Sequence, residues 1–71
     1  MTITEYRKAH NLSMEQFGVL IGRSKGHMSE IERENRCSPK LALEIERHTI
    51  GQVDAASLNG DVAAARRQQA A

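Results

Sequence analysis

Basic, hydroxyl and carboxyl side chains gather between residues 23 and 36 of this chain. Lys25, Ser29 and Glu30 fall on or near one face of a helix predicted over residues 24–33, because residues three or four positions apart share a helix face. The cations of this segment are Arg23, Lys25, Arg33 and Arg36. They give it a local basic character, although the net charge of the whole chain is only +1. Such side chains can form hydrogen bonds with another molecule, but from the residues alone a solvated helix face is the favoured interpretation.

The sequence contains no arrangement typical of catalysis. His10, His27 and His48 are far apart and lack the spacing of metal ligands. No glycine-rich phosphate loop or nucleophile motif occurs, and a chain of 71 residues offers little room for a pocket. We therefore expect no enzyme activity, no metal site and no cofactor. The single Cys37 excludes an intramolecular disulfide, and we interpret it as a small, half-buried residue rather than a redox sensor.

Length and composition predict one small soluble domain. Seventy-one residues lie near the lower limit for a self-sufficient core, and an aromatic content of 3% requires that core to be aliphatic. No apolar run approaches the roughly 18 residues that a membrane span needs, and we find no apolar region typical of a secretory signal. The lone cysteine fits a reducing compartment, so we expect a cytoplasmic protein without membrane contact.

Residues 13–21 are predicted to form a short helix. Ser13 is a suitable N-cap, and Gln16 three residues later completes a capping box. Gly22 ends the helix, because glycine adopts a left-handed conformation without a Cβ clash. The apolar residues that recur at helical spacing, and that we expect to form the buried face, are Phe17, Leu20 and Ile21.

A second helix is predicted to follow almost at once, with Ser24 as its N-cap. Met28 and Ile31 form a narrow apolar stripe that we expect to face inward. Two helices this close, with a glycine between them, suit the geometry of a helix-turn-helix. We place this motif at about residues 13–33.

The remaining segments predict further short helices. One covers residues 2–10, a second begins at Ser38-Pro39 and runs to about His48, and a third is capped by Asp54. The apolar residues expected to face the core are Ile3, Tyr6 and Ala9, then Leu41, Ala42 and Ile45, then Val53 and Leu58, although the last two could instead form a dimer contact. The predicted fold is all-α, a compact bundle of four to five short helices over residues 1–61. Residues 62–71 lack apolar periodicity and are expected to be a frayed helix or a disordered tail.

The predicted helix-turn-helix resembles the Cro/CI type of phage and bacterial DNA-binding domain. The family pattern is Leu-Thr-Gln-x-x-Leu-Ala-x-x-x-Gly-Val-Ser-x-x-x-Ile-Ser-x-Ile-Glu. The corresponding positions here are Leu12, Ser13, Met14, Phe17, Gly18, Gly22, Arg23, Ser24, Met28, Ser29, Ile31 and Glu32. Residues 41–62, LALEIERHTIGQVDAASLNGDV, also resemble the small Cro-like regulators grouped with YdaS. The resemblance covers about residues 3–61 and implies a fold of the lambda repressor-like type.

The resemblance implies that residues 24–33 enter the major groove of DNA. Lys25 would then donate to guanine, Glu30 would accept from cytosine, and Gly26 would allow close approach. The residues expected to read bases are Lys25, Gly26, His27, Ser29 and Glu30. Those expected to contact phosphates are Met14 through its backbone N–H, Arg23, Ser24, Arg33, Asn35 and Arg36. Arg66 and Arg67, in the tail, are expected to be free to touch DNA.

Two further expectations concern packing. The resemblance aligns Arg7 with a basic residue that pairs with the glutamate closing the recognition helix, which is Glu32 here. The alternative is two separately solvated charges. Gly18 replaces the usual alanine, which weakens the first helix of the motif and allows tighter packing.

The function implied by the resemblance is sequence-specific regulation of transcription. We expect a repressor of phage or mobile-element genes that binds a palindromic operator as a homodimer in a bacterial cytoplasm. The alternative is an antitoxin or antirepressor module that mainly binds a protein partner. That alternative predicts an extended apolar surface or a recognition helix without polar donors, and the sequence indicates neither.

Overall fold

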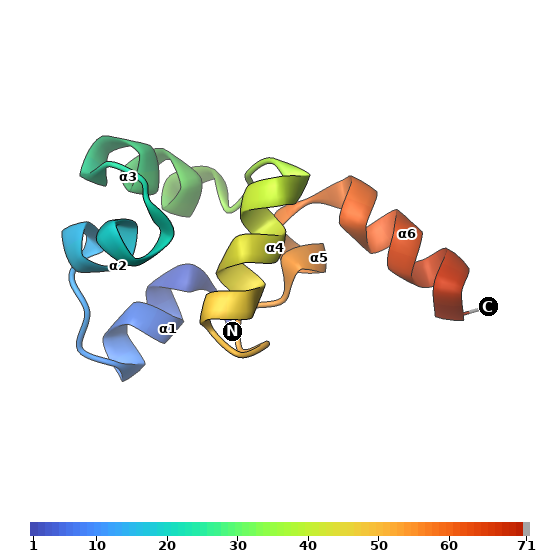
Figure 1. The fold of residues 1–71 in the computed structure, drawn as a ribbon, viewed down its shortest axis with the longest axis horizontal. Coiled ribbons are helices and arrows are strands. Elements are labelled where there is room, and N and C mark those ends of the chain that lie inside the picture. The colour runs from blue at the N-terminus through green and yellow to red at the C-terminus, as the bar shows by residue number, and fades with distance from the viewer. Residues whose placement is uncertain (71) are drawn as a thin grey trace.

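The computed structural model describes residues 1–70, and the side chains of residues 1–68, as six α-helices without a strand (Figure 1). The helices are α1 (Ile3–Ala9), α2 (Met14–Ile21), α3 (Lys25–Glu34), α4 (Pro39–His48), α5 (Ala55–Leu58) and α6 (Gly60–Ala70). The all-α prediction is confirmed, but the expected four to five helices are too few. Within residues 1–70, no helix combines the length and the apolar character needed to cross a membrane.

Hydroxyl side chains begin the first four helices. Thr2, Ser13, Ser24 and Ser38 each accept a hydrogen bond from a backbone N–H three residues later, as predicted for the three serines. Thr2 and Ser13 also form complete capping boxes. Each cap satisfies amides that have no partner within the helix, so these starts follow from local chemistry.

Residues in the left-handed conformation follow the first four helices. Asn11, Gly22 and Asn35 have φ values of 58°, 71° and 52°, consistent with residue types that tolerate this region. Ile50 follows α4 with φ of 55°, where a β-branched side chain is strained. Its amide donates to Arg47 O at 3.2 Å, and the amide of Gly51 donates to Glu46 O at 2.8 Å. These two bonds form a Schellman motif with isoleucine at the position that glycine usually occupies.

The core lies among helices α1, α2, α3 and α4, and α5 covers its remaining side. Its buried apolar residues are Ile3, Phe17, Ile21, Met28, Ile31, Leu41, Ala42, Ile45, Val53, Ala55 and Leu58. Two expectations were wrong, because Ala9 is exposed and Leu20 is 53% exposed. The buried face of α2 is formed by Phe17, Gly18 and Ile21, and this face turns Leu20 toward solvent.

Gly18 brings α2 and α3 into close contact. A Cβ atom at this position would lie 2.5 Å from the backbone oxygen of Arg23 and 3.1 Å from Cγ of Met28. The amide of Arg23 also donates to Gly18 O at 2.8 Å. The expected tighter packing is therefore confirmed, and it fixes the connection that precedes α3.

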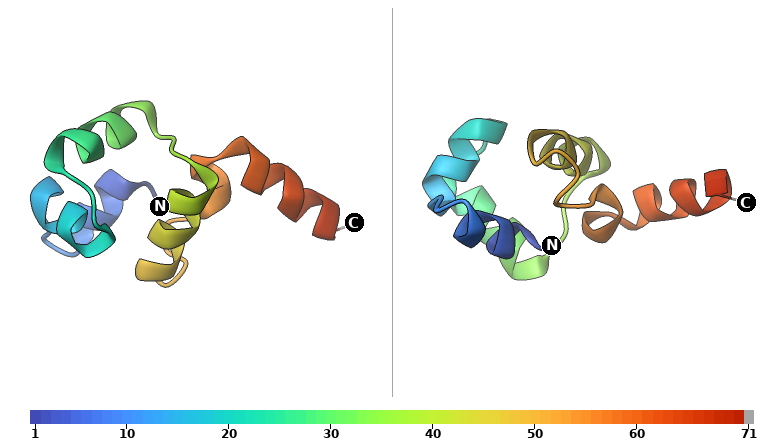
Figure 2. Two further views of the ribbon diagram at one scale, coloured as in Figure 1. Left: turned by 45° about the horizontal axis from the view of Figure 1, so that its top comes forward. Right: turned by 90° about the horizontal axis from the view of Figure 1, so that it is seen from below.

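Helix α6 covers the C-terminal tail, for which a frayed helix or a disordered segment was expected. It begins at Gly60, so the expected domain boundary at residue 61 falls in its first turn, and it projects away from the other helices in all views (Figures 1 and 2). The expectation that Arg66 is free to touch DNA was wrong, because its guanidinium pairs with Glu46 and Asp54. Arg67 is exposed.

Candidate nucleic-acid interface

Helix α3 presents a polar face to solvent. Met28 and Ile31 are buried, so the residues on the opposite side of the helix point outward. Gly26, Glu30 and Arg33 follow one another along the centre of that side, because residues four and then three positions apart lie on one line. All five residues expected to read bases are exposed: Lys25, Gly26, His27, Ser29 and Glu30.

The polar groups of this face are not used by the fold. The side chains of Lys25, Ser29, Glu30 and Arg33 make no hydrogen bond or ion pair with any other side chain or backbone group in residues 1–68. The ion pairs of that same part of the chain involve Arg7, Glu32, Arg66, Glu46 and Asp54 instead. The outer face of α3 therefore holds donors and acceptors that can bind another molecule.

A largely buried ion pair connects α3 to α1. The Nε and Nη2 atoms of Arg7 donate to the two carboxylate oxygens of Glu32 at 2.9 and 2.8 Å, and the side chains are 15% and 6% exposed. The hydroxyl of Thr4 donates to the same carboxylate at 2.8 Å, and Nη1 of Arg7 donates to Leu12 O at 3.2 Å. The expected pair is present, and its additional hydrogen bonds hold α3 in one orientation on α1.

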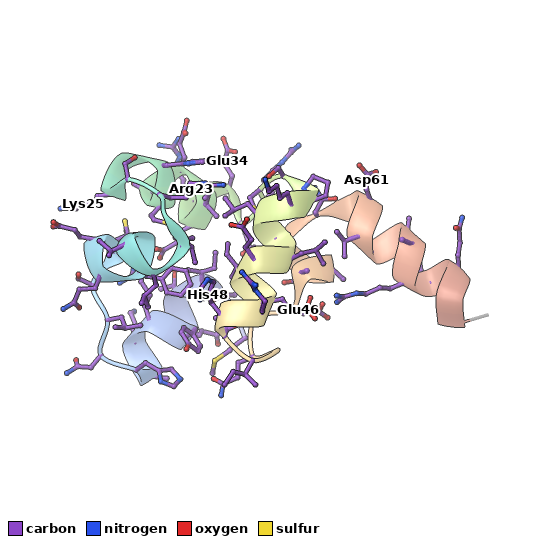
Figure 3. The ribbon with its side chains drawn as sticks, viewed as in Figure 1. Arg23, Lys25, Glu34, Glu46, His48 and Asp61 are labelled. Atoms are coloured by element: carbon purple, nitrogen blue, oxygen red, sulfur yellow. The ribbon has the colours of Figure 1, made fainter. Side chains whose placement is uncertain are left out.

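The connection between α2 and α3 contains Arg23, whose side chain is half-buried. Nη1 of Arg23 donates to Gly22 O at 3.1 Å. Burial raises the pKa of the Cys37 thiol, and the nearby charge of Arg23 acts in the opposite direction. Figure 3 shows Lys25 and Glu34 at opposite ends of α3, with Arg23 on the same side of the molecule.

The expected phosphate contacts differ in their exposure. Ser24, Arg33, Asn35 and Arg36 are exposed, whereas Arg23 and Met14 are half-buried. The hydroxyl of Ser24 accepts from the amide of His27 at 3.2 Å and keeps its own proton to donate. The side chain of Met14 packs against the core, which leaves its backbone as the group that could meet a phosphate.

The helix N-termini near this surface favour anions. The first turns of α3 and α4 contain no acidic residue, whereas those of α1 and α2 contain Glu5 and Glu15. The positive end of the helix dipole is therefore not neutralised by a carboxylate in α3 or α4. Glu30 and Glu34 lie further along α3 and reduce the positive potential there.

The turn after α3 is held by Leu58 and by Asn59, and only Asn59 was not expected from the sequence to have a role. The amide of Cys37 donates to Leu58 O at 3.0 Å, and Nδ2 of Asn59 donates to Cys37 O at 2.8 Å. The sequence gives one signal that Asn59 has a structural role. Asn59, Val62 and Arg66 are spaced as residues on one face of a helix.

Known proteins give no guide to the role of this surface. No family model, no curated protein and no solved structure matches this chain. Residues 1–70 contain no group of histidine, cysteine and acidic side chains that could hold a metal ion. The function must therefore be inferred from the polar face of α3 and its surroundings.

Proposed function

We propose that this chain is a sequence-specific DNA-binding transcriptional regulator. In this proposal α2 and α3 form a helix-turn-helix, and α3 is the recognition helix that enters the major groove. The observation that carries the proposal is the exposed outer face of α3, whose donors and acceptors are not used by residues 1–68. The Cro/CI resemblance of residues 12–32 supports the same conclusion.

The dimensions of α3 suit a major groove. Its ten residues span about 15 Å, and the groove of B-DNA admits an α-helix. Lys25 would donate to O6 and N7 of guanine, Glu30 would accept from N4 of cytosine, and Ser29 would pair with several bases. Gly26 lies on the same face without a side chain, so the helix backbone can approach a base edge closely there.

Phosphate contacts would fix the register of α3 on the duplex. Arg33 in the last turn of α3 and Arg36 in the turn that follows are exposed, and Arg23 lies half-buried in the connection before α3. Ser24, Asn35 and the backbone of Met14 complete the proposed set. We further propose a homodimer that represses phage or mobile-element genes from a palindromic operator in a bacterial cytoplasm.

One observation favours a second candidate function. Val19 and Leu20 are neighbours on α2 and are 74% and 53% exposed, which adds apolar surface outside the core. An antitoxin or antirepressor module would use such surface to hold a protein partner. The two functions predict different results in the same binding experiment.

The experiment selects duplexes from a random library and then measures affinity for the best duplex over a salt series. We expect tight binding with log K falling linearly with log salt, by about 0.9 per phosphate neutralised. Lys25→Ala should weaken binding and alter base preference at one position. Lys8→Ala is the matched control, because it removes the same charge from the exposed end of α1.

The control variant should change affinity little and leave base preference intact. If no duplex is enriched and the protein binds all sequences equally weakly, the proposal of sequence-specific DNA binding is wrong. In that case the exposed apolar residues of α2 would become the first site to test, with Leu20→Ser as the variant and a defined candidate protein as the partner.

A further inference from the structure

Helix α6 is joined to the rest of the molecule at its first residues by Asn59. Oδ1 of Asn59 accepts hydrogen bonds from the amides of Asp61 and Val62 at 2.9 and 3.3 Å, so it caps the helix. Nδ2 of the same side chain donates to Cys37 O at 2.8 Å. One amide group therefore connects the start of α6 to the turn between α3 and α4.

The second connection is Arg66, two helical turns further along. Its Nη2 donates to Oε2 of Glu46 and its Nη1 to Oδ1 of Asp54, both at 2.6 Å. The same two carboxylate atoms accept from the first amides of α5, those of Ala55 at 3.1 Å and Ala56 at 2.9 Å. Arg66 thus pairs with carboxylates that the neighbouring helix already holds in place.

Apolar residues of the first turns of α6 add to these two connections, since Val62, Ala63 and Ala64 are half-buried. Val62, on the same face and between the two connections, packs partly against the core. An isolated helix of this length is marginal in water, so its order depends on these contacts. Because Asn59, Val62 and Arg66 share one face, loss of the Arg66 pairs weakens the support of the helix beyond its first turn.

We propose that α6 is a strap that controls the order of the turn formed by residues 35–38. While Arg66 holds α6, the cap at Asn59 stays formed and keeps the backbone of Cys37 in place. When α6 is released, the bond from Asn59 to Cys37 O is lost, and the turn is held only by the bond from the Cys37 amide to Leu58 O. Asn35 and Arg36 lie in this turn, so the strap would tune their contacts with phosphates, a consequence that rests on the proposed function. The coupling between α6 and the turn is independent of the proposed function.

Cys37 supplies the reporter for the test, because it is the only cysteine of the chain and lies half-buried in the turn. The measurement is the rate at which iodoacetamide alkylates Cys37 in the full-length protein, with circular dichroism to show that each variant is folded. Asn59→Ser keeps a good N-cap for α6 but is too short to donate to Cys37 O. We expect its alkylation rate to rise about tenfold, as for the loss of one hydrogen bond from a part-buried group.

The strap itself is tested by Arg66→Gln against Arg67→Gln. Both variants remove one positive charge from α6, but only Arg66 forms ion pairs with Glu46 and Asp54. We expect Arg66→Gln to raise the alkylation rate several-fold and Arg67→Gln to leave it unchanged. Equal rates for these two variants, or a rate for Asn59→Ser equal to that of the unmodified chain, would overturn the proposal.

Affinity for the selected duplex provides the second measurement. Asn59→Ser should weaken binding relative to the unmodified chain, because it removes the bond to Cys37 O without changing any charge. Equal affinity of the two proteins would show that the order of the turn does not act on DNA binding and would overturn that part of the inference. If the unmodified protein binds no duplex, the proposed function fails, while the alkylation rates still decide whether α6 controls the turn.

Discussion

Replacing Gly26 with alanine separates the stability of the fold from its proposed function. Gly26 is the second residue of α3, it is exposed, and an added Cβ would meet no atom within 4 Å. A glycine inside a helix is less favourable than alanine by about 0.8–1.0 kcal/mol. Nothing in the fold opposes that gain, so Gly26→Ala should stabilise the protein.

The expected gain is about 0.5–1 kcal/mol, the lower value allowing for the position in the first turn. For a domain of this size, that corresponds to a rise in Tm of roughly 2–8 °C. The assay is thermal and urea unfolding followed by circular dichroism. Affinity for the selected duplex should fall in the same variant, because the added methyl group occupies the space through which the backbone of α3 approaches a base edge.

Gly18→Ala is the matched control, since it makes the same substitution one helix earlier. Its Cβ would lie 2.5 Å from the backbone oxygen of Arg23, which cannot move without shifting the start of α3. Overpacking of this kind costs about 1–3 kcal/mol and exceeds the gain in helix propensity. We therefore expect Gly18→Ala to lower the Tm while Gly26→Ala raises it.

Two results would refute this reasoning. If Gly26→Ala destabilised the protein, the conclusion that the space around Gly26 is open would be wrong. If it stabilised the protein and bound DNA unchanged, Gly26 would not face the duplex, and the proposed orientation of α3 in the groove would have to be abandoned.

Three further predictions follow from single contacts. Arg7→Ala removes the partner of the Glu32 carboxylate, which is nearly buried, and should lower the unfolding free energy by about 3–5 kcal/mol in urea titrations. An unchanged unfolding free energy would show that the pair is not stabilising. Ile50→Gly should raise the Tm, because a left-handed conformation costs an L-residue about 1–2 kcal/mol and the side chain is 90% exposed; a lower Tm would mean that Ile50 makes a stabilising contact. Burial raises the pKa of the Cys37 thiol above its ordinary value of 9.0, so the folded state binds more protons than the unfolded state once the pH exceeds 9.0. The contribution of the buried neutral thiol to the unfolding free energy is therefore present below that pH and is lost as the pH rises further. The alkaline loss of stability should therefore be smaller in Cys37→Ser, and identical pH curves would contradict this.

Local chemistry made most helix boundaries predictable. Ser13, Ser24 and Ser38 cap their helices through bonds that reach only three residues along the chain, and Gly22 adopts the left-handed conformation at a helix end. Such interactions depend on residue type and on spacing within about one turn. The predicted bounds of α2, α3 and α4 therefore lie within one or two residues of those in the structure.

The same patterns could not decide which flank of a short helix is buried. Leu20 and Gly18 lie on opposite sides of the line through Phe17, and apolar periodicity favours leucine. The structure buries Gly18 because the backbone of Arg23 and the side chain of Met28 pass close to it. That choice depends on the helix that packs against α2 rather than on α2 alone.

Helix α6 lacked an apolar signal because polar groups anchor it. Asn59 and Arg66 hold its inner face, and Arg66 finds its carboxylates 20 and 12 residues back along the chain, at Glu46 and Asp54. A search for apolar periodicity gives no weight to such residues, so the segment was expected to be frayed or disordered.

The polar character of α3 and its inward stripe were evident from the residues, because a helix of known period assigns each side chain to a face. The availability of its donors and acceptors was not, since Lys25, Glu30 and Arg33 have charged neighbours within reach along the helix. Only the tertiary structure shows that Glu32 is the charged residue of α3 that pairs within the fold, because its partner Arg7 lies 25 residues away. Bonds within one turn follow from sequence spacing, whereas pairs between helices depend on distances that the packing of the whole core determines.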